Sequence, residues 1–156
     1  MIDEISLKIL KILQNKARIP NVEVAREVGM APSAVLERIR KLEKQGFIDG
    51  YEVRLNPRRF QRSLVGFVRV ALDQNIQGNS VAEKLALIDE IQEVHFITGD
   101  DGYLIKVRVA GPDELDRLVR NQIRSIVGVR ATQTSVVLST VKETARIPID
   151  DLDLQH

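Results

Sequence analysis

The chain has 156 residues, of which 44% are apolar and 29% charged, a composition typical of globular proteins rather than disordered or membrane proteins. No apolar run approaches the roughly 20 residues that a membrane helix needs, and the N-terminus lacks the pattern of a signal peptide. We therefore expect no membrane partner and a cytoplasmic location. The absence of cysteine excludes disulfides, thiolate metal sites and a cysteine nucleophile.

The net charge of +1 is unevenly distributed along the chain. Residues 1–62 contain 13 lysines and arginines and 8 acids, whereas residues 63–156 contain 10 and 14. Local cations bind phosphates by releasing condensed counterions, so the basic first part favours a nucleic-acid partner. The alternative is a solvated surface whose charge asymmetry has no function.

Three helical patterns open the chain. An apolar stripe predicts a first helix from about Asp3 to Lys16. Two shorter patterns follow, separated at Gly29, which can end a helix in the left-handed conformation, and Pro32, which suits the first turn of the next helix. Asn21 is a suitable N-cap for the second helix. The three helices and the sharp corner predict a helix-turn-helix.

The third helix has an apolar face and a polar face. Val35, Ile39 and Leu42 recur on the side that would pack against the preceding helices. The outward side has small groups at its start and cations along its length, as a recognition helix in the major groove of double-stranded DNA requires. An ordinary helical corner with a solvated basic face is the alternative. The residues expected to contact DNA are Asn21, then Ser33, Ala34, Glu37 and Arg38 near base edges, and Arg40, Lys41 and Lys44 near phosphates.

A connector follows the helices. Apolar residues over 47–55 predict an extended segment, a wing or linker strand. We place the boundary near residue 58, which gives a DNA-binding domain over residues 1–58 and a second domain over residues 59–156. Four arginines of the connector have two interpretations, contact with the DNA backbone or simple solvation: Arg54, Arg58, Arg59 and Arg62.

The second domain alternates strands and helices. Strands are predicted at residues 64–72, 94–98, 103–109 and 129–141, and helices from Ser80 to Ile91 and from Pro112 onward. The order β-α-β-β-α-β is that of a ferredoxin-like domain. The expected fold class is therefore α+β, with a winged helix-turn-helix domain joined by a linker strand to a ferredoxin-like βαββαβ domain.

Several predicted strands are apolar on both faces. In the first strand, Val65 and Phe67 oppose Val68 and Val70. A free monomer would expose a large apolar patch, so we expect two sheets to pair in a homodimer, which would also supply two DNA-binding half-sites. The alternative is that the N-terminal domain covers the sheet.

Short motifs spread over nearly the whole chain point to a known family. They include Leu36-Glu37-Arg38, Gln45-Gly46-Phe47-Ile48, Leu55-Asn56-Pro57, Gly99-Asp100, Tyr103-Leu104 and Gly128-Val129. Each motif is weak alone. In this order, together with the order of elements, they resemble the Lrp/AsnC, or feast/famine, family of leucine-responsive and asparagine-related regulators.

The resemblance implies a transcription regulator. Its N-terminal domain would bind DNA, and its ferredoxin-like domain, often called RAM, would dimerise, assemble further to an octamer and bind a small amino-acid effector between dimers. The resemblance also implies that Arg38 either reads bases or braces the domain through a salt bridge. The implied effector-binding residues are Gly99, Asp100, Asp101, Gly102, Tyr103, Thr132, Thr134, Ser135 and Val136.

One residue departs from the pattern of the family. Members that respond to amino acids usually carry an acid immediately before the tyrosine of this loop, where the chain has Gly102. Either Asp101 replaces that acid, or the effector site is altered or lost.

An enzyme is not expected. The two histidines, His95 and His156, form no catalytic constellation, and the sequence has no phosphate-binding loop and no set of metal ligands. We therefore expect no catalytic residue, no metal and no cofactor. The alternatives are a subunit that resembles the sirohaem decarboxylases, which share the two-domain architecture, and a family member that binds DNA without an amino-acid effector.

Overall fold

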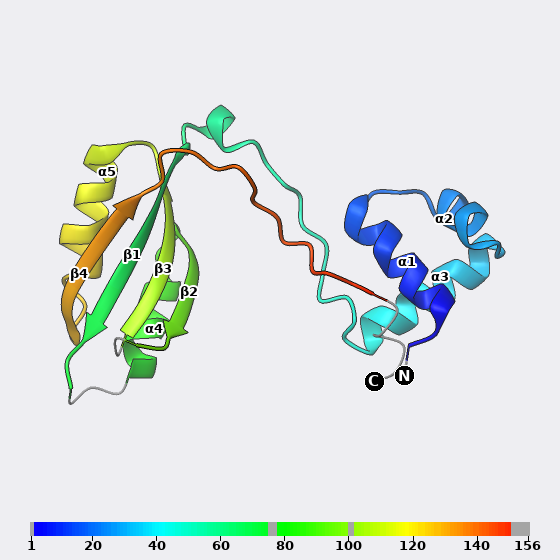
Figure 1. Ribbon diagram of the computed structural model, residues 1–156, viewed down its shortest axis with the longest axis horizontal. Helices are drawn as coiled ribbons and strands as arrows, with labels where there is room; N and C mark the ends of the chain where they lie inside the picture. The colour runs from blue at the N-terminus through cyan, green and yellow to red at the C-terminus, as the bar shows by residue number, and fades with distance from the viewer. Residues whose placement is uncertain (1, 75–77, 100–101, 151–156) are drawn as a thin grey trace. The chain divides into compact units, whose positions relative to one another are not determined.

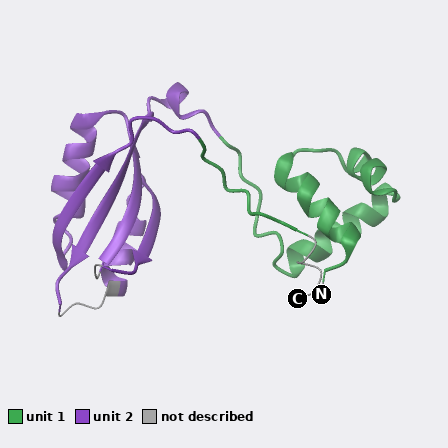
Figure 2. Cartoon of the chain, in the orientation of Figure 1, with its two compact units in different colours: residues 1–54, 142–156 green, residues 55–141 purple. Residues whose placement is uncertain are grey.

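The computed structural model describes residues 2–74, 78–99 and 102–150, and the chain divides into two compact units (Figure 2). Unit 1 comprises residues 1–54 and 142–156, and unit 2 comprises residues 55–141. The expected division at residue 58 differs from this one in that the segment after residue 141 belongs with the N-terminal helices. Among the described residues, no helix is long and apolar enough to cross a membrane.

Unit 1 is built on three helices, α1 (Glu4–Asn15), α2 (Asn21–Val28) and α3 (Pro32–Lys44) (Figure 1). Their apolar faces meet in one core, in which Ile9, Val24 and Val35 are fully buried. Burying an aliphatic side chain of this size stabilises the folded state by roughly 1.5–3 kcal/mol. The predicted three-helix core is thereby confirmed.

The corner between α2 and α3 follows from local backbone chemistry. Gly29 ends α2 in the left-handed conformation, with φ of 69°, and Pro32 begins α3, both as predicted. The expected N-cap role of Asn21 is wrong: the backbone amides of Glu23 and Val24 donate to the carbonyl of Pro20. The first turn therefore closes on Pro20, and Asn21 becomes the first helical residue.

The end of α3 is a Schellman motif. Gly46 has φ of 75°, and the amides of Gly46 and Phe47 donate to the carbonyls of Glu43 and Leu42 at 3.1 and 2.9 Å. Among the described residues, no strand precedes Leu64. The connector is therefore irregular rather than a linker strand, because a strand forms only when its backbone makes hydrogen bonds to a second strand.

The C-terminal segment packs onto α1. The side-chain amide of Gln14 donates to the carbonyl of Ile147 at 2.8 Å and accepts from the amide of Ile147 at 2.9 Å. Arg146 donates to Asn15 at 2.9 Å, and Ile149 packs against the helical core. These contacts explain why this segment belongs to unit 1.

Unit 2 is a four-stranded antiparallel sheet with helices on one face (Figure 1). A 3-10 turn, η1 (Pro57–Phe60), precedes β1 (Leu64–Leu72), α4 (Gly78–Ala86), β2 (Ile91–Ile97), β3 (Gly102–Val109), α5 (Pro112–Arg117), the π-helical turn η2 (Leu118–Ile123) and β4 (Val129–Val136). The strand order β2-β3-β1-β4 is that of the ferredoxin-like arrangement. The predicted α+β class is confirmed.

Three elements of unit 2 have bounds that differ from the predicted ones. α4 begins before Ser80 and ends at Ala86, because the amides of the next two residues turn back to carbonyls three residues earlier. β2 consequently begins at Ile91. β4 ends at Val136 rather than continuing to Val141.

The two faces of the sheet differ in chemistry. On the helix-covered face Val68 pairs with Ile105, and both are fully buried. On the opposite face Phe67, 37% exposed, pairs with Lys106. This open face is mixed rather than purely apolar, because polar side chains from neighbouring strands lie beside the apolar side chains of β1.

Candidate nucleic-acid interface and ligand site

The structure presents the predicted polar face of α3 to solvent. Val35, Ile39 and Leu42 are buried in the core of unit 1. Among the described residues, the side chains of Arg40, Lys41 and Lys44 form no ion pair. The helix can therefore offer uncompensated positive charge to phosphates. The exposed members of the predicted set on α3 are Ser33, Glu37, Arg40, Lys41 and Lys44, and Ala34 is half-buried.

Arg38 has a different environment from the other basic residues of α3. Its guanidinium donates to the carboxylate of Asp3 and, at 3.0 Å, to the hydroxyl of Ser6. The hydrogen bond from Arg38, followed by the one from the Ser6 amide, lowers the pKa of Asp3 from 3.8 to about 2. Asp3 is also the N-cap of α1, so Arg38 braces α3 against the start of α1.

A shallow hollow of about 360 Å³ lies between the start of α1 and α3. Its lining brings four predicted residues together with Asp3: Ala34, Glu37, Arg38 and Lys41. Asn21 lies apart from them, half-buried in the first turn of α2.

A larger hollow of about 1550 Å³ lies in unit 2, at the end of the sheet where strands β1 and β2 finish and strands β3 and β4 begin. Four of the predicted effector residues line it: Gly99, Gly102, Tyr103 and Thr132. Thr134, Ser135 and Val136 lie farther along β4, outside its lining. The predicted Asp100 and Asp101 lie outside the described residues.

The hollow carries charge of both signs beside aromatic side chains. Arg69, Arg130 and Asp73 line it, and the ring of Phe96 meets that of Tyr103 edge to face at 5.4 Å. A guanidinium suits a carboxylate and an acid suits an ammonium, so the hollow matches a small zwitterion. Sequence reasoning missed Arg69, although its alternation with the buried Val68 and Val70 places it on the open face.

Gly102 is enclosed by the sheet. It is buried and pairs with Ala71 of β1 and Ile97 of β2. A Cβ atom at this position would lie 2.1 Å from the carbonyl oxygen of Val70. The backbone geometry therefore leaves no room for any side chain, acidic or not, at the start of β3.

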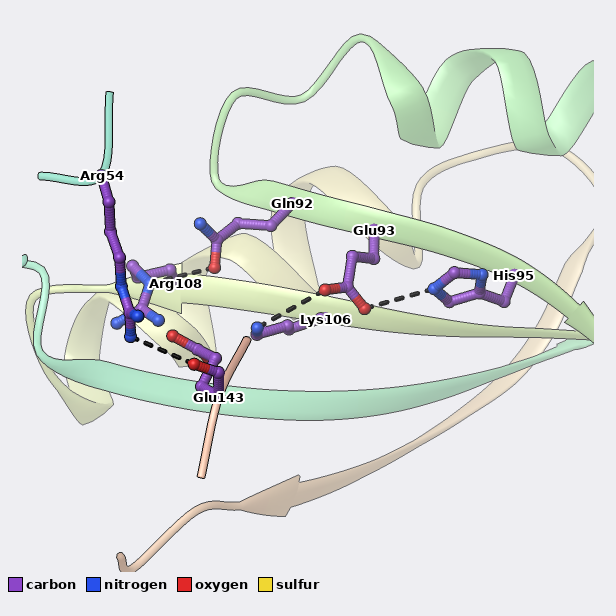
Figure 3. Close-up of polar contacts among 7 residues, drawn as sticks. All are labelled: Arg54, Gln92, Glu93, His95, Lys106, Arg108 and Glu143. Carbon is purple, nitrogen blue, oxygen red and sulfur yellow. Dashed lines mark hydrogen bonds and ion pairs between the residues drawn. The ribbon is translucent and has the colours of Figure 1, made fainter. Parts of the chain in front are cut away.

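A polar ladder crosses the open face of the sheet (Figure 3). Glu93 accepts from Lys106 at 3.4 Å and contacts His95 at 3.2 Å, and Arg108 donates to Gln92 at 2.9 Å. The figure also draws the hydrogen bond within unit 1 from Arg54 to the carbonyl of Glu143. His95 is thus an exposed member of this polar ladder, and among the described residues no cluster of His, Asp and Glu could hold a metal.

The first unit is a helix-turn-helix with an exposed cationic helix, and the second is a ferredoxin-like unit with a hollow at one end of its sheet. Together they define a two-domain DNA-binding protein. A family model described as the winged helix-turn-helix DNA-binding domain matches residues 2–49. A second, described as the Lrp/AsnC ligand binding domain, matches residues 65–147. The chain belongs to the Lrp/AsnC family of DNA-binding transcription regulators.

Known proteins resemble the chain over nearly its whole length. It is 40% identical over 153 residues to the leucine-responsive regulatory protein of Escherichia coli strain K12, and the match covers 95% of this chain and 92% of that protein. The structure of the Neisseria meningitidis regulator NMB0573 in complex with L-Met is similar with a TM-score of 0.92 at 28% identity, covering 97% of this chain and 99% of that one. Escherichia coli AsnC gives a TM-score of 0.87 at 27% identity, covering 95% and 99%.

Proposed function

We propose that α3 is the recognition helix, and that it enters the major groove of operator DNA. The observation that supports this most directly is the exposed cationic face of α3 above a fully apolar buried face. Ser33, Ala34 and Glu37 approach base edges, whereas Arg40, Lys41 and Lys44 bind phosphates. Asn21 contacts DNA from the first turn of α2. Arg38 holds the helix in place through Asp3 instead of reading a base.

Selection of bound fragments from genomic DNA, followed by mobility shifts on the selected sequences, tests this assignment. Lys41→Ala should weaken binding to all sequences and reduce the slope of log K against log salt by ~0.9 per lost phosphate contact. Ser33→Leu should instead change which sequences are selected. An unchanged salt slope for Lys41→Ala contradicts the phosphate assignment.

The hollow of unit 2 is the site proposed for a small amino-acid effector. The relative from Neisseria meningitidis was crystallised with L-Met, and the lining residues Arg69, Arg130 and Asp73 suit the two charges of an amino acid. The predicted effector residues farther along β4, Thr134, Ser135 and Val136, would complete the site from a neighbouring subunit. Calorimetry with the common amino acids tests the proposal. No heat and no change in DNA affinity with any of them would rule it out.

The proposed assembly is a homodimer that associates to an octamer. Exposed apolar side chains at and beyond the end of β4 support it: Val136 is 47% exposed and Leu138 is 97% exposed. Sedimentation velocity over a range of concentrations checks it, and a monomer throughout would contradict it. The protein is proposed to act in the cytoplasm as a regulator without catalysis or cofactor. A colourless preparation that gives no difference spectrum with haem would agree with that assignment.

A further inference from the structure

The turn η1, at the start of unit 2, is held in one conformation by several local contacts. The side chain of Asn56 accepts from the amide of Arg58 at 3.1 Å, and the amide of Arg62 donates to the carbonyl of Pro57 at 2.9 Å. Gln61 closes the turn with φ of 52°, the one left-handed residue other than glycine among those described. A non-glycine residue adopts this conformation at a conformational cost, so the turn is a fixed feature of the chain.

The charged residues from the start of unit 2 to the end of β1 are all arginines. Residues 55–72 contain four arginines and no acid, whereas residues 73–141 contain 7 lysines and arginines and 10 acids. The positive charge of unit 2, which comprises residues 55–141, is therefore concentrated at its beginning. Such a local concentration attracts a polyanion even when the rest of the unit is acidic.

The arginines of this segment and the preceding Arg54 differ in their partners. Arg54 donates to the carbonyl of Glu143, and Arg62 donates to the carbonyl of Gln61 and lies 3.7 Å from Glu114. Arg58 and Arg59 are exposed, and in the described part of the chain neither guanidinium forms an ion pair. These two side chains therefore project from a fixed turn with their charge uncompensated.

We propose that Arg58 and Arg59 form a second phosphate-binding site for duplex DNA, on unit 2 and separate from the interface of α3. The inference rests on DNA binding by the helix-turn-helix, since residues 45–56 tether the turn to a unit that already holds a duplex. A tethered site meets its ligand at high effective concentration, so two guanidinium groups suffice for a useful contact. The neighbouring Phe60 is 58% exposed and can pack against a deoxyribose. The contact is independent of base sequence, because phosphates carry no sequence information.

Salt dependence of DNA binding by the full-length protein tests the site. The double variant Arg58→Ala/Arg59→Ala should reduce the slope of log K against log salt by roughly 2, and weaken operator and random DNA by the same factor. The control, Arg117→Ala/Arg124→Ala, removes the same charge from exposed residues elsewhere on unit 2 and should leave the slope unchanged. Arg58→Lys/Arg59→Lys should retain most of the wild-type slope.

Three outcomes would overturn the proposal. In the first, the alanine variant at the turn behaves like its control. In the second, the two double alanine variants, at the turn and at the control positions, lower the slope equally, which would show that DNA binding depends only on the net charge of the protein. In the third, the turn variant changes the sedimentation coefficient but not the slope, which assigns the turn to a protein partner. Lys41→Ala, measured alongside, separates this result from a failure of α3 as the DNA-binding helix.

Discussion

Arg38 joins α3 to the start of α1. Its guanidinium binds the carboxylate that also caps α1, so one ion pair fixes the end of one helix and the orientation of another. The side chains of Arg38 and Asp3 are 30% and 55% exposed, and solvent screening limits such a pair to about 0.5–1 kcal/mol. Its main effect is therefore on position, because it holds the Arg38 side chain against the start of α1.

The pH dependence of stability should reveal this pair. Because the pKa of Asp3 falls from 3.8 in the unfolded chain to about 2 in the folded one, its contribution is complete only well above pH 3.8 and is lost as the pH falls through 2. Asp3→Asn keeps an N-cap side chain but removes the charge. We expect the variant to be about 0.5–1 kcal/mol less stable at neutral pH, with the difference vanishing below pH 2. Urea unfolding at a series of pH values measures it, and a difference independent of pH would contradict the assignment.

Gly102 is a residue where the backbone leaves space for hydrogen alone. Because a Cβ would lie 2.1 Å from the carbonyl oxygen of Val70, Gly102→Ala must push β3 away from β1. We expect a loss of roughly 1–3 kcal/mol in the free energy of unfolding of unit 2. Gly111→Ala is the control, since Gly111 also lies in unit 2 and nothing lies within 4 Å of its Cβ position. Equal stability of the two variants would show that the start of β3 can shift without cost.

At the scale of elements, the C-terminal segment stabilises the helical unit. The side-chain amide of Gln14 makes two hydrogen bonds to the backbone of Ile147. We therefore expect Gln14→Ala to lower the free energy of unfolding of unit 1 by roughly 1 kcal/mol. Hydrogen exchange of the α1 amides measures the loss. In a chain truncated after Val141 the same substitution should cost nothing, because its partner is gone. A cost that persists in the truncated chain would mean that Gln14 acts within α1.

Elements set by local chemistry were predictable from the sequence, and those set by distant partners were not. Gly29 and Pro32 determine the corner of the helix-turn-helix within a few residues, so its position was predicted. The linker strand was wrongly predicted because an apolar, β-prone segment becomes a strand only when another segment completes its ladder. The return of the chain through Ile147 to α1 had no sequence signal, since the contact joins residues 133 positions apart.

The same distinction applies to the candidate sites. The cationic face of α3 follows from helical periodicity, whereas its exception, Arg38, depends on an acid 35 positions away. In the hollow of unit 2, the resemblance to the family indicated the loop and β4. It did not indicate Arg69, which becomes part of the hollow only when β1 is placed between β3 and β4.

At the scale of the whole molecule, an effector can act on DNA binding only if it binds the DNA-bound and DNA-free proteins with different affinity. Linkage then requires reciprocity: the factor by which an amino acid changes DNA affinity must equal the factor by which DNA changes amino-acid affinity. Calorimetry of the effective amino acid with and without operator DNA measures one factor, and mobility shifts measure the other. Unequal factors would show that the amino acid also acts through a second site.

Arg130→Ala separates the effector site from the DNA-binding helix. Arg130 lines the hollow and its Nε donates to the carbonyl of Leu72 at 3.4 Å, while α3 belongs to the other unit. Losing one charge-assisted contact of about 1.5–3 kcal/mol should weaken amino-acid binding roughly 10- to 100-fold. DNA affinity without the amino acid should stay unchanged, and the concentration needed for the response should rise by the same factor. Weaker DNA binding in the absence of any amino acid would instead show that Arg130 supports the assembly that presents α3.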